Sequence, residues 1–462
     1  MPQPPHGNSS EPAGPLQRTV RRARGQRARK TDAFHARSNG GRPARQQSVK
    51  IAVDLTQLVP GGENGGAKVM TLALLRAMSR LEPRWRFTLL MRASVWDELR
   101  PFAAENVSLM VVGRREQNSF PGVQRSGHVP SAWRQRARSA RWLALPRAGH
   151  TWLLRRPRAL PDWRQLAADA YFAPLAPPRF YHPRAPLVAV VHDLQHVDCR
   201  RFFATAERLA RDMNLRMTRR RASLVICVSE FTRRRVVEHT GIERNRTCTI
   251  PIGFDPPSET DTDRDAEELL RAYGLARQAY LFFPANTWPH KNHLRLYQAL
   301  AKYAAAAPQS KLQLVCTGAD AGRRAELERA ADSLGLTERV RQLGFVGPSD
   351  LQVLLRYSKA LIFPSLYEGF GMPVLEAMHA RVPVLCSHTT SLPEVAGDAA
   401  LFLDPHAVDS IARAIARIDS EPDLAGQLIA AGQRRAAEHS TLDEMAAAYL
   451  DALSGVAATP TA

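Results

Sequence analysis

Residues Phe363–Ser387 read FPSLYEGFGMPVLEAMHARVPVLCS, and they predict a buried strand, a glycine-containing loop and a helix in succession. The strand ends at Pro364, the loop carries Gly369 and Gly371, and Pro373 suits the first turn of the helix. Glycines let a backbone approach a ligand closely, and free amides at a helix N-terminus attract anions. The pattern therefore indicates a pyrophosphate cradle, although an ordinary strand-turn-helix unit of a doubly wound sheet fits the physical features equally well.

Around this stretch, short runs rich in Val, Ile and Leu alternate with longer helical patterns, which indicates parallel sheets wrapped by helices. Several runs are almost continuously apolar, as expected of strands buried on both faces. Candidate strands in the first half are Lys50–Leu55, Arg86–Met91, Val107–Val112, Ala170–Ala173, Leu187–His192, Leu224–Ser229 and Thr247–Ile252. Candidate strands in the second half are Tyr280–Pro284, Lys311–Thr317, Arg341–Phe345, Ala360–Pro364 and Pro383–Ser387.

A linker separates the two sets of strands: Asp255–Asp265 (DPPSETDTDRD) has no apolar periodicity. A chain of 462 residues also exceeds the usual size of one hydrophobic core. We therefore predict an α/β protein with two Rossmann-like doubly wound domains, over residues 49–255 and 256–450, and a flexible tail over 451–462. The active site is expected in the cleft between the domains.

The net charge of +20 comes from two segments. Residues 1–50 hold 11 Lys and Arg against Glu11 and Asp32, and residues 113–165 hold 12 Arg against Glu116 and Asp162, which leaves +1 for the other 359 residues. Residues 1–48 are poor in apolar side chains and predict a disordered basic tail, unless the start codon is misassigned. A nearly neutral body without a recognised binding module argues against a specific nucleic-acid partner.

Residues 113–165 form a basic insertion in the N-terminal domain that interleaves arginines with Trp133, Trp142, Trp152 and Trp163. Two interpretations stay open, contact with an anionic membrane surface and a solvated surface insertion.

The five cysteines are widely spaced and form no C-x-x-C pair, which is typical of reduced thiols. No apolar run is long enough to cross a bilayer and no secretory signal is visible, so we expect a cytoplasmic protein, peripheral at most on the inner face of the membrane. The one Asp-x-Asp match that we note, Asp261–Asp263, lies in the linker, so no metal or other cofactor is expected.

The exact order of residues from Glu368 to Ala377 is more specific than the general features of a strand, a glycine loop and a helix. Glu-Gly-Phe-Gly followed by Pro-x-x-Glu-Ala resembles the Glu-x7-Glu signature of the retaining glycosyltransferases of family four, the "group 1" set with the GT-B fold. The resemblance covers roughly residues 50–450. Further matching blocks are Val191–Leu194 (VHDL), Ile226–Thr232 (ICVSEFT), Thr249–Asp255 (TIPIGFD), Phe282–His293 (FFPANTWPHKNH), Leu343–Gly347 and Leu392–Asp404 (LPEVAGDAALFLD).

The resemblance implies a role for each matching residue. Glu376 would bind the ribose hydroxyls and Glu368 the transferred sugar, while Lys291 would neutralise the departing diphosphate. The backbone amides of the loop would contact the donor; they belong to Gly369, Phe370 and Gly371. A solvated surface lysine is the alternative interpretation of Lys291.

Two further regions are expected to face the donor. Pro60–Gly66 (PGGENGG) follows the first strand, so Gly62 and Gly65 are candidate donor-binding residues, with a merely flexible connection as the alternative. His192, at the end of its strand, is similar to the family's histidine near the donor sugar, and Asp193 could cap the following turn.

One departure from the family pattern concerns the diphosphate. Many members carry an arginine five or six residues before the lysine, where this chain has Asn286 and Ala285. We retain Asn286 as a donor-binding candidate. Either Lys291 and the helix N-terminus are enough to bind the diphosphate, or Arg356 or Arg233 supplies the second contact.

The resemblance implies transfer of a hexose, with mannose first, from a nucleotide-diphosphate sugar to a polysaccharide or lipid-linked saccharide acceptor, with retention of configuration. The PHKNH run favours mannose over glucose, galactose or rhamnose. Two alternatives stay open: a catalytically silent scaffold of the same GT-B fold, and an arginine-rich nucleic-acid-binding protein.

Overall fold

The computed structural model describes residues 48–60, 65–112, 158–159, 166–175, 178, 180–256 and 263–458. One compact unit begins at Val49, where the sequence predicts the first domain to begin. The predicted basic tail, Gly62 and nearly all of the predicted insertion lie outside the described residues.

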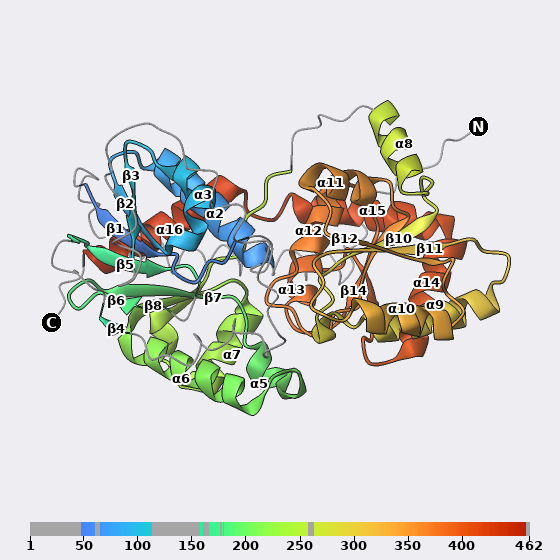
Figure 1. Cartoon of the computed structure of the whole chain (residues 1–462), viewed down its shortest axis with the longest axis horizontal. Coiled ribbons are helices and arrows are strands. Elements are labelled where there is room, and N and C mark those ends of the chain that lie inside the picture. Colours follow the sequence, from blue (N-terminus) through green and yellow to red (C-terminus); the bar gives the residue numbers. More distant parts are fainter. Residues whose placement is uncertain are drawn as a thin grey trace, which may run out of the picture. The chain divides into compact units, whose positions relative to one another are not determined.

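The first sheet has seven parallel strands in the order β3-β2-β1-β5-β7-β8-β9 (Figure 1). They are Lys50–Asp54 (β1), Arg86–Met91 (β2), Val107–Val111 (β3), Ala170–Ala173 (β5), Leu187–Val191 (β7), Ala222–Cys227 (β8) and Thr247–Thr249 (β9). Every residue of β5 and β7 is buried. Since β1 pairs with both β2 and β5, the strand order reverses there, as in a Rossmann fold.

The second sheet has six parallel strands in the order β12-β11-β10-β13-β14-β15. They are Tyr280–Pro284 (β10), Gln313–Thr317 (β11), Val340–Gly344 (β12), Ala360–Phe363 (β13), Val384–Ser387 (β14) and Leu401–Leu403 (β15). The strand order reverses at β10, which pairs with β11 and β13. The predicted pair of Rossmann-like domains is confirmed, although the sequence missed β15, whose three residues are too few to show a strand pattern.

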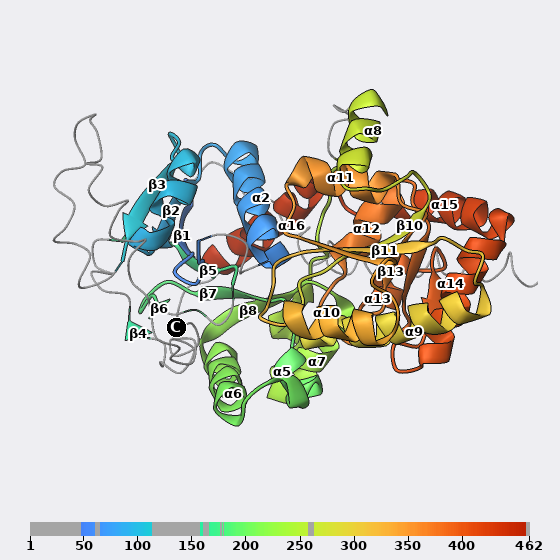
Figure 2. The same ribbon diagram turned by 45° about the vertical axis from the view of Figure 1, so that its right-hand side comes forward.

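Helices connect the strands of both sheets. In the first half these are α2 (Gly65–Leu81), α3 (Trp96–Leu99), α5 (Gln195–Asp198), α6 (Thr205–Arg221) and α7 (Glu230–Thr240). In the second half they are α8 (Asp263–Ala272), α9 (His293–Ala306), α10 (Arg324–Ser333), α11 (Pro348–Arg356), α12 (Met372–His379), α13 (Leu392–Ala396), α14 (Val408–Ser420), α15 (Pro422–Ala436) and α16 (Leu442–Ala457). Helices α9 and α10 lie side by side in both views (Figures 1 and 2). Two short strands, β4 (Arg158–Ala159) and β6 (Phe180–Tyr181), pair separately.

Helix α16 returns to the first sheet, where it packs against α2 and β5 (Figure 1, red beside blue and green). Tyr449 of this helix is buried, and its ring centroid lies 5.8 Å from that of Phe172 in β5. Leu453 is also buried. The predicted flexible tail is therefore wrong over residues 451–457, because their apolar side chains complete the core of the first domain.

The chain thus crosses between the domains twice, and the two crossings touch. A Cβ atom on Gly253 would lie 2.2 Å from the carbonyl oxygen of Thr441. The amide of Phe254 donates to the carbonyl oxygen of Ser440 at 3.1 Å. Only a glycine lets the two backbones approach this closely.

Candidate active site

The carboxyl ends of β10 and β13 bring together two charged side chains. Lys291 ends a short 3-10 helix (Pro289–Lys291) after β10, and Glu368 lies in the loop after β13. Because β10 and β13 are parallel neighbours, both loops emerge at the same edge of the sheet. Lys291 Nζ lies 2.6 Å from Glu368 Oε1, and the side chains are only 14% and 11% exposed. The predicted phosphate-binding and sugar-binding residues therefore form a largely buried ion pair.

Asn292 fixes the turn that carries Lys291. Its φ of 70° is left-handed, a conformation that asparagine tolerates better than most residues. Its buried side-chain amide donates to the carbonyl oxygens of Pro364 at 3.0 Å and Pro405 at 2.8 Å. Asn292 thus ties the turn before α9 to the end of β13.

The carbonyl groups of the glycine loop are held by hydroxyl groups. Ser391 Oγ lies 3.0 Å from the carbonyl oxygen of Glu368 and 2.8 Å from that of Phe370. From the first domain, Ser229 Oγ and Thr232 Oγ1 lie 2.7 Å and 3.2 Å from the carbonyl oxygen of Gly369. These contacts fix the orientation of three consecutive peptide groups.

The amides of the same loop point elsewhere. Those of Gly369, Phe370 and Gly371 have no protein acceptor within the described parts of the chain. Gly371 is the N-cap of α12 and has a φ of 111°, which a residue with a side chain rarely adopts. Successive free amides at a helix N-terminus form an anion-binding site. The three amides are therefore free to bind an anion at the start of α12.

The loop also touches the first domain. A Cβ atom on Gly369 would lie 1.9 Å from the carbonyl oxygen of His192, so no side chain fits there. Nearby, the Glu394 carboxylate accepts hydrogen bonds from the amides of Glu230 at 2.7 Å and Phe231 at 3.0 Å. A carboxylate at the first turn of α7 satisfies free amides and complements the helix dipole. Residues of both domains thus shape this site.

A backbone contact fixes the ring orientation of His192. Its Nε2 lies 2.8 Å from the carbonyl oxygen of Pro174, which can only accept a hydrogen bond. Nε2 therefore carries a proton, and in the neutral ring Nδ1 can accept a hydrogen bond. Burial lowers the pKa of His192. The amide of Gln195 donates to Asp193 Oδ1 at 3.1 Å, although the N-cap residue of α5 is Leu194.

Glu376 lies one turn inside α12. Burial raises the pKa of its carboxyl to about 7. No side chain among the described residues hydrogen-bonds to this carboxylate or pairs with it. A carboxylate of this kind can accept hydrogen bonds from ligand hydroxyls, and such bonds would stabilise its charged form.

Two further predicted donor-binding residues lie close together. A Cβ atom on Gly65, at the start of α2, would lie 4.0 Å from Asn286 Nδ2 and 3.9 Å from Trp288 Cη2. Asn286 Oδ1 accepts from the amide of Ala319 at 2.7 Å, which orients the side chain. Arg233, one proposed replacement for the missing arginine, donates to Thr247 Oγ1 at 3.0 Å and would have to leave that bond. Arg356, the other, packs over the Tyr357 ring.

Two family models match the chain, one for each domain. Residues 64–257 match glycosyltransferase family 4, and residues 265–435 match glycosyl transferases group 1. The chain belongs to the group 1 glycosyltransferases of family four. Within the described residues of this glycosyltransferase, no helix is long and apolar enough to cross a membrane.

Curated relatives of this glycosyltransferase include O-antigen chain mannosyltransferase B of Escherichia coli, 30% identical over 51% of this chain and 62% of the relative. The D-inositol 3-phosphate glycosyltransferase of Rhodococcus opacus is 30% identical over 44% of this chain and 47% of that protein. The matched part thus spans less than two thirds of either relative.

Solved structures support the fold. HepE of Anabaena, in complex with UDP and glucose, has a TM-score of 0.63 at 19% identity and covers 88% of this chain and 100% of that chain. A glycosyltransferase from Rickettsia africae has a TM-score of 0.61 at 15% identity and covers 89% and 100%. The predicted GT-B fold is confirmed.

The sequence did not reveal the residues that hold the glycine loop in place. Ser229, Thr232 and Glu394 lie in blocks that resemble the family, and Ser391 immediately precedes one. The sequence shows their hydroxyl and carboxyl side chains, but their hydrogen-bond partners lie more than a hundred residues away or in a separate loop. A pattern of hydroxyl residues does not specify which carbonyl group they contact.

Proposed function

We propose that this glycosyltransferase transfers a hexose, with mannose as the first candidate, from a nucleotide-diphosphate sugar to a polysaccharide or lipid-linked saccharide, with retention of configuration. The observation that carries the proposal is the Lys291–Glu368 pair beside the free amides of the glycine loop. The similarity to O-antigen chain mannosyltransferase B supports mannose as the transferred sugar and a saccharide as the acceptor.

In this proposal, the donor diphosphate lies against the amides of Gly369, Phe370 and Gly371, with Lys291 as its cationic partner. An arriving diphosphate competes with the Glu368 carboxylate for the Lys291 ammonium. Glu368 is then released to accept hydrogen bonds from hydroxyls of the sugar. Glu376 accepts from the ribose hydroxyls, and His192 Nδ1 accepts from one more sugar hydroxyl.

The transfer breaks the bond between the anomeric carbon and the diphosphate oxygen, and it forms a bond to an acceptor hydroxyl on the same face. Negative charge grows on the departing diphosphate, where Lys291 and the fixed amides stabilise it without reorganising. The acceptor proton passes to an oxygen of the leaving phosphate. The products are the nucleoside diphosphate and the glycoside. We propose that the step needs no divalent cation, because these groups supply the positive field.

We propose that the reaction occurs at the cytoplasmic face of a membrane, where a lipid-linked acceptor is accessible. The proposal includes contact with an anionic membrane surface, because residues 113–165 are rich in arginine and tryptophan. Almost all of this segment lies outside the described residues.

The test is transfer with GDP-mannose, UDP-glucose, UDP-galactose and dTDP-rhamnose, each with a lipid-linked saccharide acceptor and with EDTA present. We expect one donor to be used, and NMR of the product to show the anomeric configuration of that donor. An inverted product would contradict retention, and loss of transfer in EDTA would contradict metal independence. Use of no donor would favour the silent scaffold.

A further inference from the structure

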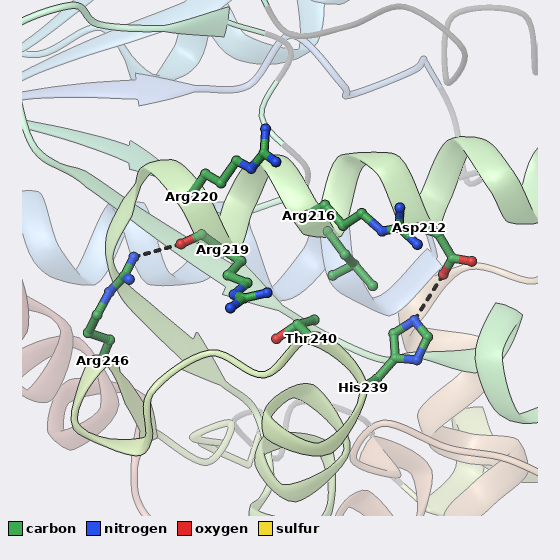
Figure 3. A pocket seen from close by; sticks show the side chains of 8 residues that line it. Asp212, Arg216, Arg219, Arg220, His239, Thr240 and Arg246 are labelled. Atoms are coloured by element: carbon green, nitrogen blue, oxygen red, sulfur yellow. Dashed lines mark hydrogen bonds and ion pairs between the residues drawn. The ribbon is translucent and has the colours of Figure 1, made fainter.

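A pocket of about 650 Å³ lies between the C-terminal half of α6 and the C-terminal end of α7 (Figure 3). Among the described residues, its ionisable lining residues are Asp212, Arg216, Arg219, Arg220, His239 and Arg246. Four arginines and one aspartate therefore contribute to the lining of one cavity. Pockets of this volume hold small ligands, but such pockets are usually apolar, so the excess of positive charge is unusual.

Three of the arginines have no carboxylate partner. Arg216, Arg219 and Arg220 are exposed, and no acidic side chain pairs with them in the part of the chain that the structure describes. Arg216 precedes Arg219 and Arg220 by three and four residues, a spacing at which like charges on a helix repel one another. An anion in the pocket would relieve this repulsion.

The end of α6 does not explain these charges. Arginines often interact with free carbonyl groups at a helix C-terminus. Here Arg246 does so, since it donates to the carbonyl oxygens of Arg219, at 2.7 Å, and Ala222. Arg221 instead lies over the Tyr181 ring, 3.7 Å from its centroid. The guanidinium groups of Arg216, Arg219 and Arg220 therefore stay available.

Asp212, the acidic side chain among the described lining residues, contacts two histidines. Asp212 Oδ1 lies 3.0 Å from His239 Nε2, an interaction that Figure 3 shows at the edge of the pocket. It also lies 3.3 Å from His196 Nε2. On the other side, Arg219 extends toward Thr240 (Figure 3) and passes Gly241, the left-handed C-cap of α7. A Cβ atom on Gly241 would lie 3.8 Å from the guanidinium carbon of Arg219.

The pocket is separate from the candidate active site. Helix α7 begins at Glu230, beside the glycine loop, and ends at Thr240 in the pocket. Eleven residues of helix span about 16 Å. The arginines therefore cannot contact a diphosphate bound at Lys291.

We propose that the α6–α7 pocket binds a phosphate group, either a free phosphomonoester or the headgroup of an anionic phospholipid. Guanidinium groups match phosphate oxygens with paired hydrogen bonds. The cavity is larger than a phosphate ion, which leaves room for the rest of a headgroup. Nucleic acid fits less well, because bases bind by stacking and His239 is the only aromatic ring among the described residues of the lining. This inference does not depend on the proposed function.

The test uses the full chain in the Lys291→Ala background, which removes the proposed contact to donor phosphate. Calorimetry measures binding of inorganic phosphate and glycerol 3-phosphate to this protein. The pocket variant combines Arg216→Ala, Arg219→Ala and Arg220→Ala. The control variant removes the same charge from exposed arginines of the second domain, by Arg271→Ala, Arg413→Ala and Arg434→Ala. Circular dichroism verifies that both variants fold.

We expect the pocket variant to weaken phosphate binding at least tenfold and the control variant less than twofold. Flotation with phosphatidylglycerol and phosphatidylcholine vesicles then separates the two sources. A loss of phosphatidylglycerol binding in the pocket variant alone assigns a lipid headgroup, and unchanged flotation assigns a free phosphomonoester. Equal phosphate binding by both variants would overturn the proposal. It would also be overturned if single-stranded RNA bound in a pocket-dependent way while phosphate and vesicles did not.

Discussion

Lys291 Nζ lies 2.6 Å from Glu368 Oε1, so each of these two largely buried groups is the charge partner of the other. Removal of one partner leaves the other buried and uncompensated, which costs roughly 3 kcal/mol. Removal of both charges avoids that cost. Stability and catalysis therefore respond differently to single and double substitutions.

We predict that Lys291→Met and Glu368→Gln each lower the free energy of unfolding, while the double variant regains most of the loss. Turnover should fall by about 10²-fold or more in Lys291→Met, as for loss of an electrostatic stabiliser, and should not recover in the double variant. Denaturant unfolding and donor turnover measure the two effects. Recovery of turnover in the double variant would show that Lys291 acts only through Glu368.

Glu376 should make donor binding depend on pH. Burial raises the pKa of its carboxyl to about 7, so the group is partly protonated near neutral pH. Ribose hydroxyls would donate to the charged form and lower that pKa in the complex. Donor affinity should therefore rise as the pH increases from 5 to about 7 and level off above it, with proton release on binding below pH 7. Calorimetry in buffers of different ionisation enthalpy measures this release, and Glu376→Gln should abolish it. An unchanged pH profile in that variant would assign the dependence to another group.

Gly369→Ala tests the contact between the glycine loop and the first domain. Its Cβ atom would lie 1.9 Å from the carbonyl oxygen of His192, so the loop or the first domain must move. We expect at least a tenfold loss of turnover, since small displacements of a positioned group are costly. Gly426→Ala is the matched control, because Gly426 is exposed in α15 and a Cβ atom there meets nothing within 4 Å. The control should keep full turnover and gain up to about 1 kcal/mol of stability. Equal turnover of the two variants would contradict the close approach.

Glu394→Gln tests the hydrogen bonds between α13 and α7. The carboxylate accepts from the amides of Glu230 and Phe231, and the amide side chain can accept with only one atom. We predict a loss of about 1 kcal/mol in the free energy of unfolding and weaker donor binding. Glu421→Gln, which removes a surface pair with Arg417, should change stability by less than half as much. Equal losses in the two variants would argue against a role for Glu394 in joining the domains.

The sequence predicted the strands that carry the site, because apolar runs between glycine and proline signals specify buried parallel strands. The position of Lys291 after β10 came from the resemblance of Phe282–His293 to the family's lysine-bearing block. The pairing of Lys291 with Glu368 was not predicted. That pairing depends on the left-handed turn at Asn292 and on two carbonyl groups more than seventy residues away.

The sequence did not predict that α16 packs against the first domain, for a related reason. A flexible tail was predicted from residue 451, whereas Leu442–Ala457 is a helix with buried apolar residues. Even a visible apolar face would not specify which core such a helix packs on. The choice depends on the crossing at Gly253 and Thr441, where two backbones touch. Contacts of this kind arise between residues far apart in the chain and leave no local periodicity.

The most direct test of the donor site is slow hydrolysis of radiolabelled nucleotide sugars by the purified protein. The variants are Lys291→Ala and Glu376→Ala, and the matched controls are the surface substitutions Lys302→Ala and Glu421→Ala. We predict release of one sugar by the wild-type protein and both controls, and a loss of at least tenfold in Lys291→Ala and Glu376→Ala. Release that persists unchanged in Lys291→Ala and Glu376→Ala would contradict the assignment of the donor site to the loop between β13 and α12.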